Sequence, residues 1–480
     1  MAAFSKIAQL ARPEAFQDYL RANGIGLPFL SELPEPAALN LARPLSYRDR
    51  TIGNRWAILP MEGWDCEPNG APSELTRRRW LRFAKSGAKL LFGCEAAAVM
   101  ESGRGNTRQL TICDRTVEAT AALHAEMVRT HEETFGRRDD LYVGLQLTHS
   151  GRFSHPHDDT KLESVIAYRN PWLDKKFGNQ DTPVASDAQI DEMIGHFIHA
   201  GELAARAGFD FVDIKHAHGY FGHELLSAYD RPGKYGGSLE NRSRFFLDIA
   251  QGIRKAAPGL DISLRFSLFD VVPYVKGPDG VGTPITDGNY PYAFGGDGTS
   301  SGSGYDLSEP FEFIERIVKE ADVRMVCATV GSPYYNPHLQ RPAAFPVFDG
   351  YAMPFDPLKS VAMHIAAAAE FKRRFPDLLI VGSGYTYLQD WLPNVAEAVL
   401  AAGMIDSVGI GRMVLSYPEL CDDILKGRPV QRKRICRTLG DCTNAPRNGM
   451  VSGCYPLDAF YKTRPEAREL RSVHASHRLD

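Results

Sequence analysis

Residues 217–246 read AHGYFGHELLSAYDRPGKYGGSLENRSRFF, and they follow the apolar run GFDFVDIK at 208–215. The run has the length and composition of a strand that is buried on both faces. A basic residue and two imidazoles stand where this strand ends, at Lys215, His216 and His218. In a barrel of parallel strands the catalytic groups gather at this end. The stretch therefore predicts a barrel strand that leads into a functional site.

Short apolar runs alternate with amphipathic segments along the chain from Leu45 onward. Strands are predicted at 56–60, 88–94, 141–147, 209–215, 261–267, 323–329, 378–382 and 406–410. Helices are predicted near 74–86, 116–134, 187–207, 241–257, 308–320, 357–374, 388–402 and 417–425. Strands that alternate with helices in this way favour a parallel barrel over a doubly wound sheet. We therefore expect an α/β fold, a (β/α)8 TIM barrel.

Three segments interrupt this alternation and suggest how the chain is divided. Residues 1–44 form an N-terminal extension rich in Pro and Ala, and residues 45–430 form the barrel. Within the barrel, residues 270–307 are an insertion that contains FGGDGTSSGSG. The insertion follows the fifth strand and so lies on the catalytic face, where it is either a mobile lid or a surface linker. Residues 431–480 are a C-terminal tail with clustered cysteines.

Composition and charge exclude several classes of protein. The net charge is −4 and the isoelectric point is near 6.4, which argues against binding to nucleic acid or anionic membranes. No stretch approaches the roughly 20 apolar residues of a spanning helix. Five of the eight cysteines are scattered, as reduced cytosolic thiols are. We expect a cytoplasmic homo-oligomeric enzyme that acts on a small-molecule substrate.

The quoted stretch also places the chain beside a known family. The tripeptide HGY at 218–220, followed by YGGSLENR at 235–242, closely resembles the corresponding block of the old yellow enzyme family. These proteins are FMN-dependent NADH:flavin oxidoreductases that include ene-reductases. The resemblance implies a TIM barrel, bound FMN, NADH or NADPH as electron donor, and hydride transfer to an α,β-unsaturated carbonyl compound.

Two glycine-rich strand ends form a candidate phosphate cradle. Gly382-Ser383-Gly384 follows the seventh strand, and Gly409-Ile410-Gly411-Arg412 follows the eighth. Glycines let backbone N–H groups approach a phosphate, and Arg412 adds a charged partner. Barrels commonly bind phosphate at this place. The pattern predicts that Ser383, Gly384, Gly411 and Arg412 bind the FMN phosphate.

The resemblance assigns further contacts to the flavin ring. It implies that Gln146 and Arg265 hydrogen-bond the pyrimidine edge, and that the backbone at Pro60, Met61 and Ala96 contacts the ring. An arginine in an otherwise apolar strand needs a partner in any case, and the alternative for Arg265 is a structural salt bridge.

The substrate end follows the family pattern with departures. The resemblance places Lys215 and His218 as hydrogen-bond donors to a substrate carbonyl, and Tyr220 as the proton donor. Lys215 stands where the family usually has His, so it could polarise the carbonyl, act as a base or simply pair with a carboxylate. Glu62 stands where many members have a small residue, and a carboxylate there could attract a cationic substrate. His216 and His223 are interpreted as packing residues rather than zinc ligands.

The tail cysteines leave several interpretations open. Cys436-x5-Cys442-x11-Cys454 matches three of the four positions at which larger relatives, such as trimethylamine dehydrogenase and dienoyl-CoA reductase, hold a [4Fe–4S] cluster; the remaining position is Leu439. A cluster with a fourth ligand such as Asp441 or water, a zinc site, and loss of the cluster are all compatible with the pattern.

Two other functions compete with the reductase. One is an FMN-dependent amine dehydrogenase or N-demethylase, which Glu62 and the cluster-like tail favour. The other is a flavin-binding protein without turnover, which the set of Gln146, Arg265, His218 and Tyr220 argues against.

Overall fold

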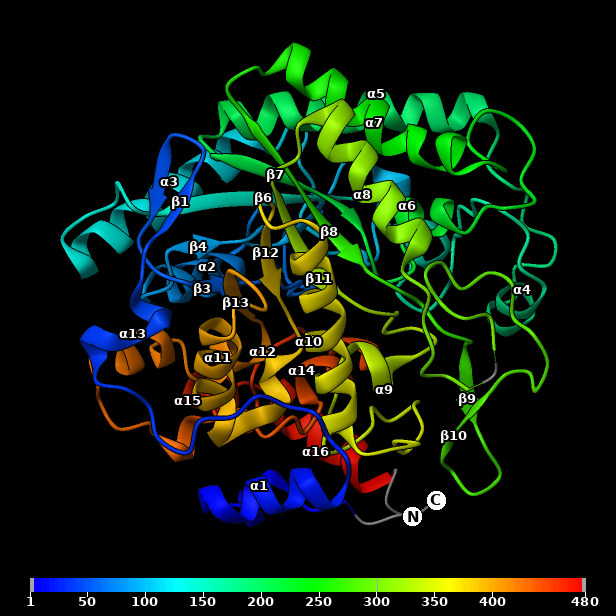
Figure 1. Ribbon diagram of the computed structural model, residues 1–480. Coiled ribbons are helices and arrows are strands. Elements are labelled where there is room, and N and C mark those ends of the chain that lie inside the picture. Colours follow the sequence, from blue (N-terminus) through cyan, green and yellow to red (C-terminus); the bar gives the residue numbers. More distant parts are fainter. Residues whose placement is uncertain (1–3, 300, 477–480) are drawn as a thin grey trace.

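The computed structural model describes residues 4–299 and 301–476, so residues 1–3, 300 and 477–480 of the extension, insertion and tail lie outside it. Eight parallel strands close into a barrel, in which β4 pairs with both β3 and β6 (Figure 1). They are β3 (Trp56–Ile58), β4 (Leu90–Leu91), β6 (Tyr142–Thr148), β7 (Phe211–His216), β8 (Asp261–Ser267), β11 (Met325–Thr329), β12 (Leu379–Gly382) and β13 (Ser407–Ile410). The predicted TIM barrel is confirmed, and every barrel strand falls in or beside its predicted range.

The helices surround the barrel as the alternation predicts. They are α2 (Glu74–Ala84), α3 (Val117–Phe135), α5 (Asp187–Arg206), α7 (Leu239–Ala256), α8 (Ser308–Ala321), α10 (Pro357–Arg374), α11 (Leu392–Ala401) and α13 (Leu420–Leu425). Helix α7 begins two residues earlier than predicted because the Ser238 side chain accepts a hydrogen bond from the Asn241 N–H and caps the helix. Helix α11 begins later than predicted because Gln389, with φ 54°, kinks the 3-10 segment (Tyr385–Trp391) that precedes it.

A hairpin closes the N-terminal end of the barrel. Strands β1 (Leu45–Tyr47) and β2 (Arg50–Ile52) pair with each other, and the Tyr47 hydroxyl donates to Asp261 Oδ2 at 2.5 Å. Large side chains fill the interior above the hairpin. Phe211 has room there because residue 144 is glycine, where a Cβ atom would lie 2.3 Å from the Phe211 ring. The opposite, C-terminal end is therefore the end at which the barrel can hold a ligand.

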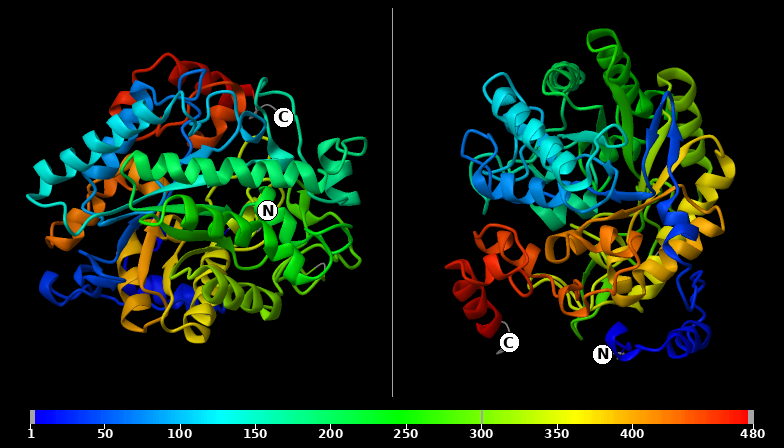
Figure 2. Two further views of the ribbon diagram at one scale, coloured as in Figure 1. Left: turned by 90° about the horizontal axis from the view of Figure 1, so that it is seen from above. Right: turned by 90° about the vertical axis from the view of Figure 1, so that its left-hand side faces the viewer.

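The additional segments pack against the barrel on different sides. Helix α1 (Pro13–Ala22) rests on Trp391 through Phe16, with ring centroids 5.6 Å apart. The insertion forms a hairpin of β9 (Tyr274–Lys276) and β10 (Gly282–Pro284). The tail contains α14 (Asp441–Asn444), α15 (Ala459–Lys462) and α16 (Glu466–Ser476), and Figures 1 and 2 show it on the side of the barrel away from α5 and α7. None of the helices described here is both long and apolar enough to cross a membrane.

Candidate functional site

A cavity of about 260 Å³ opens at the C-terminal end of the barrel. This volume is near the lower end of the range for small-molecule sites, roughly 300–1,000 Å³. Its walls come from the segments after β3, β7, β8, β11, β12 and β13 and from the tail. The lining includes Pro60, Met61, Glu62, His218, Arg265, Gln340, Arg341, Ser383, Gly384, Gly411, Arg412 and Cys442.

Neighbouring strands place polar groups in register below the cavity. Gln146 of β6 lies opposite Asp213 of β7, and Lys215 of β7 lies opposite Arg265 of β8. Asp213 accepts hydrogen bonds from Gln146 Nε2 and from the backbone N–H of Arg265, each at 2.5 Å. Burial raises the pKa of Asp213 to about 6. Gln146 and its strand neighbour Ala96 are buried and do not line the cavity, so this cluster supports the wall from behind.

The predicted phosphate cradle is gathered at one end of the cavity. Gly384 has φ 91°, and a Cβ atom there would lie 3.0 Å from the His364 ring, so the turn requires glycine. Arg412 begins the short helix α12 (Arg412–Ser416), and its Nη2 donates to the Pro342 carbonyl at 3.0 Å. The other terminal nitrogen, Nη1, is buried without a partner among the described residues.

A second arginine, Arg341, lines the same end of the cavity. Desolvation, together with the neighbouring Arg412 charge, lowers the pKa of Arg341 to about 10. We did not predict this residue from the sequence. It lies after the short helix α9 (Pro337–Gln340), well beyond the end of β11, and no local motif marks it.

Unpaired cationic groups test whether this cavity suits FMN. Within the described chain, the guanidinium groups of Arg265, Arg341 and Arg412 form no salt bridge with a carboxylate, and Arg265 Nε is also buried without a partner. A buried donor without a partner costs about 1–3 kcal/mol, so convergence of such donors indicates a ligand that supplies acceptors. FMN offers a phosphate and a pyrimidine edge. The residues present therefore fit FMN.

A cluster built around Tyr220 adjoins the cavity at Glu62, which lines it, whereas Lys215 and Tyr220 do not. Lys215 Nζ lies 3.6 Å from Glu62 Oε1 and 3.5 Å from the centroid of the Tyr220 ring. The Tyr220 hydroxyl is 3.4 Å from the same Glu62 oxygen and 3.1 Å from the hydroxyl of Tyr334. Burial lowers the pKa of Lys215 to about 8, and burial together with Glu62 holds the pKa of Tyr220 well above its ordinary value. Tyr334, like Arg341, comes from the loop after β11 and was not predicted.

His218 lines the cavity in an unusual backbone conformation. Its φ is 68°, its N–H donates to Ser267 Oγ at 3.1 Å, and its carbonyl accepts from Ser332 Oγ at 2.7 Å. A non-glycine residue in this region of φ is held there by its surroundings. Burial and the nearby Arg265 and Lys215 charges lower the pKa of the His218 imidazole well below its usual value, so the ring is neutral. Its Nε2 lies 2.9 Å from the amide nitrogen of Gln340.

The other two histidines of the motif have packing environments. His216 is surrounded by the rings of Phe245, Phe246 and Phe313, and His223 Nδ1 accepts a hydrogen bond from the Gly219 N–H at 2.8 Å. Within the described residues, the two do not form a metal-ligating group with His218.

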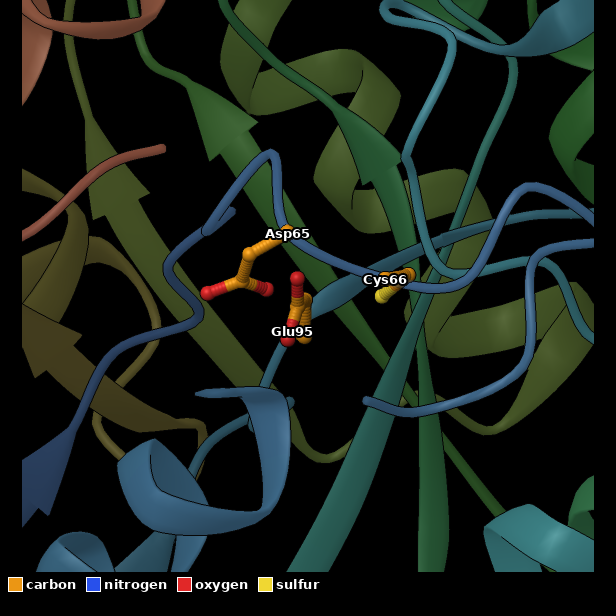
Figure 3. A group of neighbouring side chains, drawn as sticks. All are labelled: Asp65, Cys66 and Glu95. Carbon is orange, nitrogen blue, oxygen red and sulfur yellow. The ribbon is translucent and has the colours of Figure 1, made fainter. Parts of the chain in front are cut away.

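Asp65, Cys66 and Glu95 are the one group of potential metal ligands in the described part of the chain (Figure 3). The Arg79 guanidinium already bridges the two carboxylates, at 2.5 Å from Asp65 and 2.7 Å from Glu95. Glu95 also accepts from the Gly63 N–H at 3.2 Å. The group is therefore a buried ion-pair network that fixes the Met61–Gly63 turn beside the cavity.

The tail cysteines lie near the cavity but do not gather into a metal site. Cys442 lines the cavity, Cys454 is buried, and the Cys436 N–H points to the Met413 sulfur at 3.3 Å. In the described range, their three sulfur atoms do not all lie within 4.8 Å of one another. Leu439 is 37% exposed. A cluster or zinc at these cysteines stays a prediction.

Comparisons with known proteins identify the family of this chain. The family model described as the NADH:flavin oxidoreductase / NADH oxidase family matches residues 40–283. The NADPH dehydrogenase of Bacillus subtilis (strain 168) is 30% identical over 386 residues, covering 79% of this chain and 93% of the relative.

Solved structures share the fold at lower sequence identity. The 2-naphthoyl-CoA reductase complex with 2-naphthoyl-CoA has a TM-score of 0.62 at 18% identity, and the match covers 90% of this chain but 57% of that one. Morphinone reductase in complex with tetrahydroNAD has a TM-score of 0.54 at 18% identity, covering 82% of this chain and 92% of that one. The chain belongs to the NADH:flavin oxidoreductase / NADH oxidase family and is an FMN-dependent NAD(P)H oxidoreductase.

Proposed function

We propose that the protein reduces the alkene of an α,β-unsaturated carbonyl compound at the expense of NADPH or NADH. The observation that supports this most strongly is the grouping of Lys215, His218 and Tyr220 at the end of β7, beside the unpaired Arg265. This grouping offers two nitrogen donors for a carbonyl oxygen and a hydroxyl proton for a carbon atom. The name of the Bacillus subtilis relative makes NADPH the first donor to test.

The cofactor and the chain would divide the chemistry between them. When bound, FMN would supply the chemistry of hydride transfer between the nicotinamide and the substrate. Pro60, Met61 and Arg265 would hold its ring, and Ser383, Gly384, Gly411 and Arg412 its phosphate. Gln146 would act through Asp213, which accepts from both Gln146 and the Arg265 backbone.

Substrate activation would fall to the three residues after β7. Lys215 and a neutral His218 donate hydrogen bonds to the carbonyl oxygen, which withdraws electron density from the alkene. Tyr220 holds the proton that the α-carbon receives, because its raised pKa keeps the hydroxyl protonated at neutral pH.

Anaerobic spectroscopy tests this proposal directly. We expect the purified protein to show a flavin spectrum that NADPH or NADH bleaches and that 2-cyclohexenone then restores. Tyr220→Phe should leave the bleaching step unchanged and slow the restoration roughly 100-fold or more, as loss of a general acid does. Equal restoration in both proteins would remove Tyr220 from the proton-donor role, and a colourless protein that takes up no FMN would overturn the assignment.

Oxidation of an amine is the second candidate, and one observation weighs against it. A cationic substrate would need a free carboxylate, whereas Glu62 is already paired with Lys215 at 3.6 Å. Bleaching of the flavin by a small methylamine in place of NADPH would favour this alternative.

A further inference from the structure

We propose that Glu62 returns a proton to Tyr220 after each turnover, and that Lys215 stores this proton. This inference rests on the proposed reduction of an unsaturated carbonyl compound. It adds two roles to that reaction: a proton relay residue, and a store for the proton that the α-carbon consumes.

One oxygen atom connects the two groups. Glu62 Oε1 lies 3.6 Å from Lys215 Nζ and 3.4 Å from the Tyr220 hydroxyl. The Glu62 side chain is 18% exposed while that of Lys215 is 5% exposed, so Glu62 is also the member of the cluster that meets solvent. A proton can therefore move between Lys215 and Tyr220 through a single carboxylate.

The surroundings of Tyr220 make such a relay necessary. Tyr220 is 3% exposed, and loss of its proton would leave a buried anion beside the Glu62 carboxylate. The Tyr334 hydroxyl lies 3.1 Å away and can donate to the phenolate oxygen, but among the described residues it has no hydrogen bond to an ionised side chain from which to regain a proton. Tyr334 is held by stacking on Phe153, with ring centroids 3.8 Å apart and planes 6° from parallel.

The steps balance in protons and electrons. The Tyr220 O–H bond breaks as its proton bonds to the α-carbon, while the hydride that reaches the β-carbon derives from NAD(P)H. Lys215 Nζ then gives a proton to Glu62, and Glu62 gives a proton to the Tyr220 oxygen. Finally, water protonates Lys215 through Glu62. Each turnover takes up one proton from solvent.

The relative acidities favour this direction. The pKa of Lys215 is lowered to about 8, whereas that of Tyr220 is raised well above its ordinary value, so a proton passes downhill from the ammonium to the phenolate. The other titratable or charged groups that face Lys215 are Arg265, Asp213 and His218, whose pKa is lowered well below its usual value. A guanidinium does not titrate in proteins, and Asp213 has a pKa of about 6. Within this set, only Lys215 changes charge near pH 8.

The pH dependence follows with a definite sign. Below pH 8 the Lys215 amine holds the proton that the relay needs. The amine loses this proton as the pH rises through about 8. We expect the wild-type rate of repeated turnover with NADPH and 2-cyclohexenone to fall above this pH. Neither Glu62→Gln nor Lys215→Met should show that fall, because neither variant can complete the relay.

Repeated turnover tests the role of Glu62, because a single oxidation starts with Tyr220 already protonated. The enzyme turns over with excess NADPH and either 2-cyclohexenone, which needs a proton on carbon, or ferricyanide, which needs none. Glu62→Gln should slow turnover with the enone roughly 100-fold relative to turnover with ferricyanide, as removal of an acid–base group does. Glu67→Gln, an exposed carboxylate in the same loop, is the matched control and should behave as wild type.

A measurement on FMN-free protein separates this inference from the proposed function. The protonation of Lys215 is followed by NMR of ¹³Cε-labelled lysine, with Lys215→Met identifying the signal. The midpoint near pH 8 should move lower in Glu62→Gln, because the carboxylate stabilises the ammonium. An unmoved midpoint, or an unchanged rate of repeated turnover with the enone in Glu62→Gln, would overturn the relay alone. Failure of every enone to oxidise the reduced wild type would overturn the proposed function, and the relay with it.

Discussion

The two ends of the barrel differ in whether a buried charged side chain has partners, and strand β8 carries one example of each. At its N-terminal end Asp261 is fully partnered, by the hydroxyls of Tyr47 at 2.5 Å and Tyr142 at 3.2 Å and by Arg48 at 3.1 Å. Four positions along the same strand, Arg265 has a buried Nε without a partner in the described chain. A buried charge with a full set of partners stabilises the closed end of the barrel. A buried donor without a partner, at the open end, indicates a site for a ligand that supplies an acceptor.

The paired Arg79 provides the sharpest test of this distinction, because it lies beside the cavity but has two carboxylate partners. Arg79→Leu should lower the free energy of unfolding by about 3–5 kcal/mol, since it leaves Asp65 and Glu95 buried without a counter-charge. Urea denaturation of FMN-free protein measures this. Arg77→Leu on the same helix is the control; its side chain is 44% exposed, so its change should stay within about 0.5 kcal/mol.

Removal of an arginine without a carboxylate partner should lower the affinity for FMN and leave the free energy of unfolding unchanged. Arg412→Ala should weaken FMN binding about 10- to 100-fold, the equivalent of a charge-assisted hydrogen bond of about 1.5–3 kcal/mol. Titration with FMN, followed by quenching of flavin fluorescence, measures the dissociation constant. The free energy of unfolding of FMN-free protein should not fall. Arg428→Ala, which removes an exposed arginine paired with Asp422 and Asp423, should leave FMN affinity unchanged.

A substitution at the closed end of the barrel should change the free energy of unfolding but not the affinity for FMN. Asp261→Ala leaves the Tyr47 and Tyr142 hydroxyls without their acceptor and should lower the free energy of unfolding by about 1–3 kcal/mol. FMN affinity should equal that of the wild type, and Asp181→Ala at an exposed position should change neither quantity. If Asp261→Ala also lowered the affinity for FMN, the two ends of the barrel would not have separate roles in stability and ligand binding.

The smallest effect is expected at Arg341, which lines the same cavity as Arg412. Arg341→Ala should weaken FMN binding by about 0.5–1.5 kcal/mol, or roughly 2- to 10-fold, because Arg412 and the backbone N–H groups remain. The same fluorescence titration measures it. An unchanged dissociation constant for FMN at every salt concentration would show that Arg341 does not contribute to FMN binding.

The barrel could be predicted from the sequence because its signals are local. Each apolar run became a strand, and each amphipathic segment became a helix at nearly the predicted bounds. The late start of α11 could not be predicted, since it depends on Gln389 adopting a positive φ. Arg341 and Tyr334 could not be predicted either, because the loop that presents them has no motif and reaches the site only through the closure of the barrel.

The two departures from the family pattern could each be identified in the sequence, but not their connection. By the resemblance, Lys215 stands where the family usually has His and Glu62 where many members have a small residue, at positions far apart in the chain. In the structure the two side chains form one ion pair. Their contact depends on the closure of the barrel, which neither position reveals by itself.

The tail is the last part of the site to be synthesised. Cys442, Thr443 and Ser452 line the cavity, and the Ser452 N–H holds the Gly63 carbonyl at 2.8 Å, yet all three come later in the chain than every barrel strand. Folding during synthesis proceeds from the N-terminus. The barrel can thus close around its core while one wall of its mouth is still missing, and the mouth is completed only when the ribosome has delivered the tail.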